Sequence, residues 1–176
     1  SRLVDAVNQS QVAISSDSIQ QMVSQVRNNL GAEEATITLK FPYFINKFAP
    51  VTLMEGQMDY DCKLTGTINS NGFDLITEVV VPVTSLCPCS KEISDRGAHN
   101  QRSLVTIAVK SRAEYIWADD LINIAEKSAS APLYSLLKRP DEKFVTEQAY
   151  DNPVFVEDLV RSVASRLKDD SRVNWF

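Results

Sequence analysis

The sequence lacks any long hydrophobic run. Its apolar stretches, such as residues 79–83, are far shorter than the roughly 18 residues needed to cross a bilayer. The N-terminus shows none of the charged, apolar and small-residue segments of a secretory signal. Repeats, low-complexity segments and Pro- or Gly-rich linkers are also missing. These absences predict a cytoplasmic protein with no membrane partner and a single domain over residues 1–176.

Histidine occurs once, at His99, and cysteine three times, at Cys62, Cys87 and Cys89. So few cysteines, in an odd number, argue against a disulfide framework and favour the reduced thiols of the cytosol. Any imidazole chemistry must use His99. Eighteen Lys and Arg against 23 Asp and Glu give a net charge of −5. This acidic balance argues against a nucleic-acid partner or an anionic membrane, but permits a small anionic ligand at a local basic cluster.

Hydrophobic periodicity predicts an α+β fold, with helices packed on one face of an antiparallel sheet. The predicted helices span residues 16–30, 117–126 and 155–168, and the predicted strands span 36–41, 52–69, 73–83 and 103–110. Asn71-Gly72 predicts a type I′ hairpin turn, because both of its central residues require positive φ. The apolar face of the last helix is predicted to comprise Val156, Leu159, Val160, Val163 and Leu167.

Residues that can bind a metal or take part in catalysis concentrate in 84–103. This segment is a predicted irregular connection between two strands. In extended backbone the Cys87-Pro88-Cys89 spacing would place both sulfurs on the same side. The loop could then bring His99 back to the same point. Two thiols and an imidazole are good ligands for Zn²⁺ and related metals. The four ligands of a closed structural site are not present, which favours an open catalytic site with a carboxylate ligand or a free thiol.

Structural interpretations remain open for the same residues. Cysteine is often a small core residue, and this interpretation is strongly favoured for Cys62 on a predicted strand. A lone histidine is often a hydrogen-bonded loop residue. The basic side chains of the loop could be solvated or could neutralise phosphates; they are Lys91, Arg96 and Arg102. Four acidic residues near predicted helix starts cannot be distinguished by periodicity alone, and they are Asp141, Glu142, Glu157 and Asp158.

Four segments together closely resemble the signature of the prokaryotic type IB GTP cyclohydrolases. They are 85–94 (SLCPCSKEIS), 97–103 (GAHNQRS), 137–143 (LKRPDEK) and 152–158 (NPVFVED), and the resemblance covers essentially the whole chain. It implies the tunnelling fold (T-fold), in which antiparallel sheets carrying paired helices assemble into barrels. Members of this family are longer at both ends, so we expect this chain to lack their N-terminal strands and C-terminal segment.

The same resemblance implies an activity. Members of this family open the imidazole ring of GTP at C8, release formate and form 7,8-dihydroneopterin triphosphate, the first step of tetrahydrofolate biosynthesis. The implied cofactor is a divalent metal, Zn or Mn, held by Cys87, His99 and Glu142. Cys89 and His99 are the implied proton-transfer residues, and Glu157 is the implied guanine-binding carboxylate. Plausible triphosphate contacts are Lys91, Arg96 and Arg102.

The resemblance also implies a homo-oligomer, a dimer or tetramer, with sites near subunit interfaces. The predicted 52–83 hairpin supports this expectation, since an exposed edge would need a partner or cover. Two other functions remain open. One is a T-fold protein that binds a purine or pterin without turnover, and the other is a zinc-stabilised structural domain. Metal-dependent formate release from GTP would separate the enzyme from both.

Overall fold

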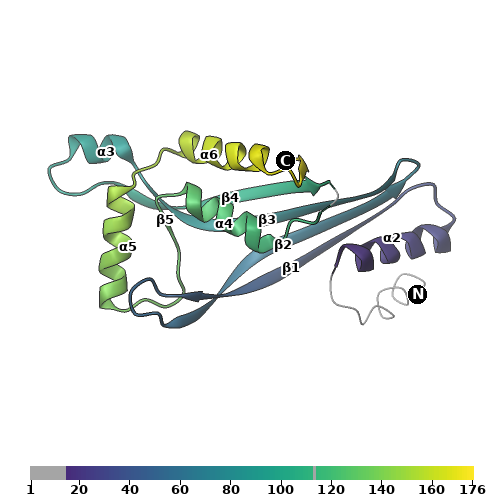
Figure 1. The fold of residues 1–176 in the computed structure, drawn as a ribbon, viewed down its shortest axis with the longest axis horizontal. Helices are drawn as coiled ribbons and strands as arrows, with labels where there is room; N and C mark the ends of the chain where they lie inside the picture. The colour runs from purple at the N-terminus through teal and green to yellow at the C-terminus, as the bar shows by residue number, and fades with distance from the viewer. Residues whose placement is uncertain (1–14, 113) are drawn as a thin grey trace.

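The computed structural model describes residues 15–112 and 114–176. An antiparallel sheet runs through this part of the chain in the strand order β1-β2-β3-β4-β6, and β5 also pairs with β3 (Figure 1). The strands are β1 (Ala35–Phe48), β2 (Glu55–Asn69), β3 (Gly72–Leu86), β4 (Asn100–Ser111), β5 (Ala131–Pro132) and β6 (Val173–Trp175). The helices are α2 (Ser16–Leu30), α3 (Pro88–Ile93), α4 (Ala118–Ser128), α5 (Arg139–Asp151) and α6 (Val156–Asp169).

The helices that build the two main cores pack on one face of the sheet. The main core joins this face to α4 and α6, and includes Tyr60 and Cys62 of β2. A second core lies under α2 and includes Leu64 and Ile68 of the same strand. Even-numbered residues of a strand share one face, so both cores lie on the same side. The predicted α+β fold, with helices on one face of an antiparallel sheet, is confirmed.

Contact between α2 and the sheet is close because β2 has a glycine beneath the helix. A Cβ atom at Gly66 would lie 2.6 Å from Cγ2 of Ile19 and 3.2 Å from Cγ2 of Val23. Both side chains belong to the second core. Any larger residue at Gly66 would therefore push α2 away from β2.

The predicted long hairpin is present, but its turn differs from the prediction. Asn69 pairs with Gly72, so the central residues are Ser70 and Asn71. Gly72 alone of these has positive φ, at 112°, which is incompatible with type I′. The Asn69 side chain accepts a hydrogen bond from Asn71 N–H (2.8 Å). An Asn that starts a turn by binding its own backbone, with Gly in the fourth position, stabilises this alternative.

The hairpin also lies inside the sheet, contrary to the exposed edge that the sequence suggested. β1 pairs with β2 along its whole length, and β4 pairs with β3. The predicted strand 36–41 lies in the first half of this longer β1. Phe44 and Phe48 continue it, and their side chains are on its exposed face.

The apolar face of α6 is narrower than predicted. Leu159, Val163 and Leu167 are buried, whereas Val156 and Val160 are more than half exposed. Residues four apart lie on the same side of a helix, whereas Val160 is turned about 100° from Leu159. Only the side with Leu159, Val163 and Leu167 faces the sheet and is buried.

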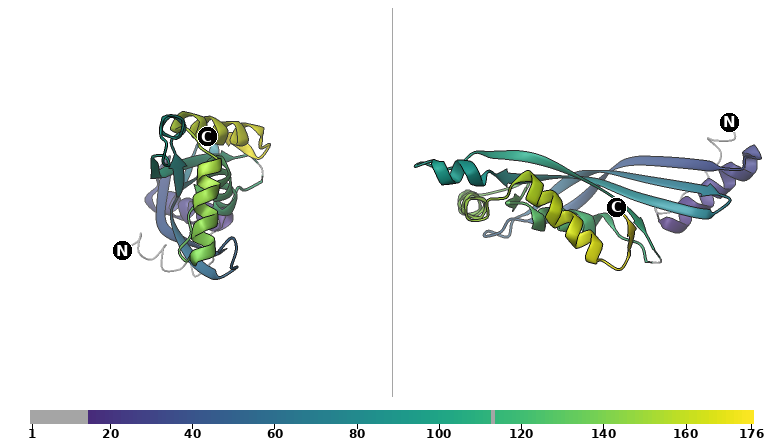
Figure 2. Two further views of the ribbon diagram at one scale, coloured as in Figure 1. Left: turned by 90° about the vertical axis from the view of Figure 1, so that its left-hand side faces the viewer. Right: turned by 90° about the horizontal axis from the view of Figure 1, so that it is seen from above.

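The molecule is elongated, and its two ends carry different elements. Figure 2 shows α2 at one end of the sheet and α3 projecting from the other. β2 pairs with β3 only as far as Asp61 and Val80. β5 then pairs with β3 at Val83 and Thr84. No helix in the described part of the chain is long and apolar enough to cross a membrane.

Asp141 attaches α5 to the turn between β1 and β2. Its carboxylate is fully buried. It accepts hydrogen bonds from Val51 N–H (2.9 Å), Thr52 N–H (2.9 Å), the Thr52 hydroxyl (2.7 Å) and Lys138 N–H (2.9 Å). Burial raises the pKa of this carboxyl, but the bonds from Thr52, Lys138 and Val51 outweigh it and hold the pKa well below its usual range. The ionised form is therefore built into the fold.

We expect Asp141→Asn to lower the melting temperature by several degrees at neutral pH. An amide NH₂ cannot accept the Lys138 and Thr52 bonds, so buried donors lose their partners. Wild-type stability from this carboxylate is complete above the usual Asp pKa of about 4 and is lost as pH falls toward the lower folded-state pKa. The difference between the two proteins should therefore shrink below about pH 4.

Thermal unfolding followed by circular dichroism from pH 7 to pH 3 would measure this difference. Asp151→Asn, at the exposed C-terminal end of the same helix, is the matched control and should change little. A constant difference across the pH range would contradict the ionised, stabilising role of Asp141.

Candidate metal and substrate site

The end of the β3–β4 ladder brings Cys87 and His99 together. Leu86 pairs with Asn100 in the last regular position. One residue further, Cys87 N–H donates to the His99 carbonyl oxygen at 2.8 Å. The expectation that the loop returns His99 to Cys87 is therefore confirmed at the level of the backbone. The antiparallel register places a thiol and the single imidazole of the chain on facing residues.

Between them the loop is partly helical. Cys87 has extended backbone (φ −73°, ψ 117°) and precedes α3, in which Pro88 occupies the first turn. Proline suits this position because its missing N–H would have no helical partner there. Cys89 is thus helical and exposed. The expectation of an extended Cys-x-Cys with both sulfurs on one side was wrong, since Pro88 starts a helix directly after Cys87.

The surroundings of Cys87 favour its thiolate, which is the form that binds metals. Hydrogen bonding from Ser90 N–H lowers the pKa of the thiol; partial desolvation opposes this, and the Ser90 hydroxyl and Cys89 N–H add to the lowering. Cys62 is the opposite case. Burial raises its pKa to about 11, and it belongs to the main core. The structural interpretation of Cys62 is confirmed.

Glu157 lies at the same end of the sheet as Cys87. Val154 N–H donates to the Leu86 carbonyl oxygen (3.0 Å), and the Ser85 hydroxyl donates to the Val154 carbonyl oxygen (3.2 Å). These bonds attach the segment before α6 to the last residues of β3. Glu157 follows three residues after Val154, in the exposed first turn of α6. The structure thus brings the predicted guanine-binding carboxylate to the end of β3 that carries Cys87.

Glu142, the third predicted metal ligand, is placed differently. It is exposed in the first turn of α5, beside the residue that binds the β1–β2 turn. The other end of α5, at Tyr150, contacts α3 through Lys91. Glu142 and Tyr150 are about 12 Å apart along the helix axis, since each residue rises 1.5 Å. Among residues 15–112 and 114–176, no three His, Cys, Asp or Glu side chains are grouped closely enough to hold a metal ion.

The donor chemistry nevertheless suits a metal. A thiolate-favouring cysteine and a histidine on adjacent backbone are half of a tetrahedral site for Zn²⁺ or a related divalent ion. Cys87 and His99 fit that role, and one chain supplies no third ligand beside them in its described part. The assignment of Glu142 stays a prediction.

The three basic residues of the predicted triphosphate site have different surroundings. Lys91 packs its ammonium over the Tyr150 ring, 4.1 Å from the centroid, and donates to the Tyr150 carbonyl oxygen. It therefore joins α3 to α5. Arg96 is exposed in the loop between α3 and β4. Arg102, near the start of β4, lines a hollow of about 510 Å³ with Pro82 and Tyr134.

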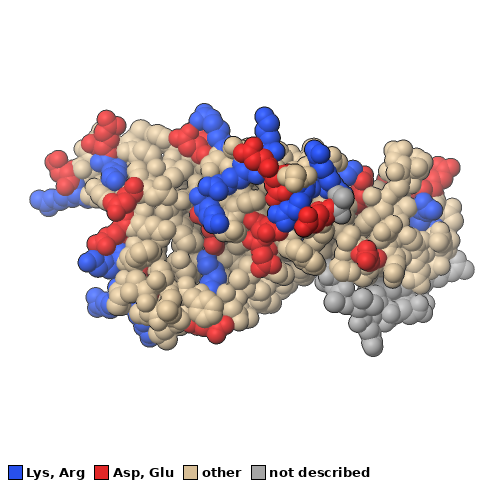
Figure 3. Space-filling view, in the orientation of Figure 1, with Lys and Arg blue, Asp and Glu red and all other residues tan. Residues whose placement is uncertain are grey.

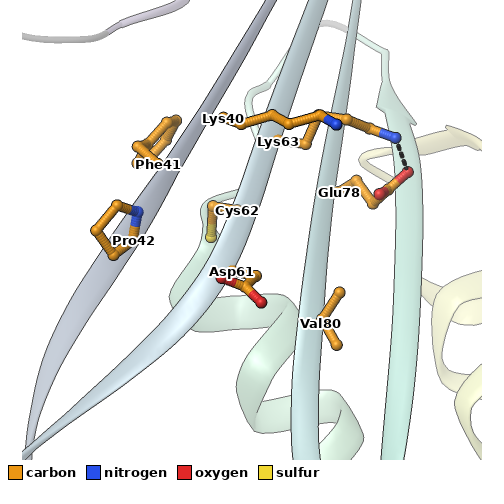
Figure 4. A pocket seen from close by; sticks show the side chains of 8 residues that line it. All are labelled: Lys40, Phe41, Pro42, Asp61, Cys62, Lys63, Glu78 and Val80. Carbon is orange, nitrogen blue, oxygen red and sulfur yellow. Dashed lines mark ion pairs between the residues drawn. The ribbon is translucent and has the colours of Figure 1, made fainter.

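A second hollow, of about 440 Å³, lies farther along the sheet and involves none of the predicted site residues. Figure 4 shows its lining from β1, β2 and β3, with an ion pair between Lys63 and Glu78 (2.6 Å). On the face in Figure 3, acidic and basic side chains are interspersed without a large basic area.

Two residues that hydrogen bond within the elements around the predicted site were not singled out from the sequence. Ser90 hydrogen bonds to both Cys87 and His99, and Asp141 fixes the start of α5. A signal existed for Asp141, because an acidic residue just after Arg139-Pro140 matches the third position of a helix, where it can bind back to the preceding N–H. For Ser90 the sequence offered only one signal, its spacing of three residues from Cys87.

Comparisons with known proteins identify the family of this chain. The family model for type I GTP cyclohydrolase FolE2 matches residues 1–176. The chain is 51% identical to GTP cyclohydrolase FolE2 of Nitrosococcus oceani and 49% identical to that of Magnetococcus marinus; each match covers all of this chain and 66% of the relative. It is 50% identical to that of Desulfosudis oleivorans, over 68% of the relative. The chain spans about two thirds of the length of these relatives, and it belongs to the type I GTP cyclohydrolase FolE2 family.

Proposed function

We propose that this chain forms the catalytic region of a metal-dependent GTP cyclohydrolase. The reaction converts GTP and water to 7,8-dihydroneopterin triphosphate and formate, the first step of tetrahydrofolate biosynthesis. The observation that carries the proposal is the convergence of Cys87, His99 and Glu157 at one end of the sheet, in a chain whose relatives are named GTP cyclohydrolases. The free thiols of Cys62, Cys87 and Cys89 support a cytoplasmic location.

Cys87, His99 and Glu142 would hold the metal, Zn or Mn. When bound, such an ion supplies Lewis acidity and lowers the pKa of water enough for hydrolysis at neutral pH. Cys89 is exposed in the first turn of α3, one residue from Pro88 and two from Cys87. Thiol and imidazole groups ordinarily titrate close enough to neutrality to exchange protons. Cys89 and His99 are therefore the proposed proton-transfer residues.

Glu157 would select guanine. An ionised carboxylate accepts from both N1–H and the exocyclic NH₂ of guanine, whereas adenine offers no such donor pair. Its position in the exposed first turn of α6 leaves the carboxylate free to meet a ligand. Lys91, Arg96 and Arg102 are the proposed triphosphate contacts, with Lys91 exchanging its contact with Tyr150 for a phosphate oxygen.

The first test is formate release. Incubation of the protein with GTP and Mn²⁺ or Zn²⁺ should yield formate and a fluorescent pterin. Cys87→Ala should lose at least 100-fold in turnover, because a metal ligand is removed, while the melting temperature changes little. Cys62→Ala is an unsuitable control because Cys62 is in the core, so Ser94→Ala at the end of α3 serves instead. Wild-type protein that binds GTP without releasing formate would favour the binding-protein alternative.

Glu142 would act on the site of a neighbouring subunit. Its place in the first turn of α5 supports this, since Lys91 of α3 contacts the opposite end of that helix, and no three ligand side chains group together in the described residues. A homo-oligomer with sites at its interfaces, a dimer or tetramer, would bring the ligands together. Exposed apolar residues near the β1–β2 turn support such an interface, and they are Phe44, Phe48, Val51, Leu53 and Met54.

Subunit mixing tests this arrangement. Cys87→Ala and Glu142→Ala should each be inactive alone. When the two proteins are unfolded, mixed and refolded together, hybrid oligomers should recover a substantial part of wild-type activity, because some sites then have all their ligands. Light scattering should show an oligomer. If the mixture stays inactive while each variant forms oligomers of normal size, Glu142 does not complete the site of a neighbour.

A separate test addresses guanine recognition. Glu157→Gln should reduce kcat/KM for GTP by about 10-fold or more, since losing a charged acceptor costs roughly 1.5–3 kcal/mol. A helix-start role alone would cost only about 0.3–1 kcal/mol of stability. Asp158→Asn is the matched control, because Asp158 shares the first turn and pairs with Arg161 (2.6 Å). If both variants change kcat/KM for GTP equally, Glu157 is not the carboxylate that binds guanine.

A further inference from the structure

The last pair of the β3–β4 ladder has one direct backbone hydrogen bond, and a serine side chain takes the place of the second. In an antiparallel sheet, two residues of a hydrogen-bonded pair exchange both N–H···O bonds. The register makes Cys87 and His99 such a pair, and Cys87 N–H donates to the His99 carbonyl oxygen (2.8 Å). The reciprocal bond is replaced by a bridge. His99 N–H donates to Ser90 Oγ (2.7 Å), and the Ser90 hydroxyl donates to the Cys87 carbonyl oxygen (3.0 Å).

The start of α3 explains why the direct bond is missing. The Cys87 carbonyl oxygen accepts the first backbone bond of this helix, from Lys91 N–H at 3.2 Å. A carbonyl that serves a helix following on its own chain is turned from the neighbouring strand. Ser90 lies in that helix, three residues after Cys87, where its side chain reaches both groups. One hydroxyl thus occupies the gap between strand and helix.

We propose that Ser90 is a positioning residue that sets the separation and orientation of Cys87 and His99. The inference rests on the proposed metal-binding function of these two residues. Ser90 is the third point of a closed loop of hydrogen bonds, so the two backbones cannot shift independently while its hydroxyl is present. Without the hydroxyl, the strands could close the direct rung or separate around water, and each change would move the thiolate and imidazole relative to each other.

Cobalt binding provides a readout that does not depend on turnover. Co²⁺ bound to a thiolate gives a charge-transfer absorption, and its visible bands report coordination geometry. Ser90→Ala should bind Co²⁺ about 10-fold more weakly than wild type and show altered visible bands, which is the usual scale for removing a group that orients metal ligands. Ser90→Thr keeps the hydroxyl and should restore affinity and spectrum to near wild type.

Ser94→Ala is the matched control. Ser94 follows α3, is exposed, and its hydroxyl accepts only from Arg96 N–H (3.2 Å) among the hydrogen bonds found in the described residues. Its Co²⁺ affinity and spectrum should equal those of wild type. Melting temperatures of all variants should be measured, and a loss of affinity in Ser90→Ala without a matching loss in folded fraction supports the positioning role.

Two results would overturn the inference, and they are distinguishable. If wild type binds Co²⁺ with a thiolate band and Ser90→Ala binds it equally well with the same spectrum, Ser90 does not position the ligands, although the proposed metal site stands. If wild type itself shows no thiolate–cobalt band, the proposed metal site fails and the inference fails with it. Should Ser90→Ala not fold, the comparison of Ser90→Thr with Ser90→Val, which has the same shape but no hydroxyl, decides. Unequal affinities, with threonine the tighter, support the hydroxyl bridge, and equal affinities refute it.

Discussion

The pairing of β3 with β4 is the constraint on which the rest of the site depends. Its register places Cys87 opposite His99, and the alternation of buried residues from Thr77 to Val81 favours that register. Val79, Val81 and Val83 must all face the core, and a slip by one residue would turn them outward. Burial of these valines therefore stabilises the strand pairing that sets the thiol beside the imidazole, since each buried side chain contributes roughly 1.5–3 kcal/mol to folding.

A second constraint divides the predicted metal site between the ends of one helix. Asp141 ties the start of α5 to the β1–β2 turn, while Lys91 and Tyr150 tie its end to α3. Moving the start of α5, which carries Glu142, would therefore break the buried hydrogen bonds of Asp141. The proposed oligomeric site is compatible with these attachments, since a symmetric neighbour can supply a residue across an interface.

Periodicity was a good guide to the elements and a poorer guide to their details. Apolar residues recur with the helical period in 16–30 and 155–168 and alternate along the hairpin. These three elements were therefore predicted. The type I′ turn was wrong because Asn69 forms a competing bond to its own backbone. Helix α3 was missed because six residues around a cysteine pair carry no periodic signal, and the exposure of Val156 and Val160 depends on which line of α6 meets the sheet.

The sequence by itself determined the chemistry available. One histidine, a Cys-x-Cys pair twelve residues before it and the resemblance of four segments pointed to a metal site and a family, because residue types and spacing are local properties. Only the tertiary structure decided which of those groups meet. It joined Cys87 to His99 through a ladder rung, attached the segment before Glu157 to the end of β3 through Val154, and placed Glu142 in the first turn of α5. Strand register and helix direction follow from packing across the whole chain, which no local pattern contains.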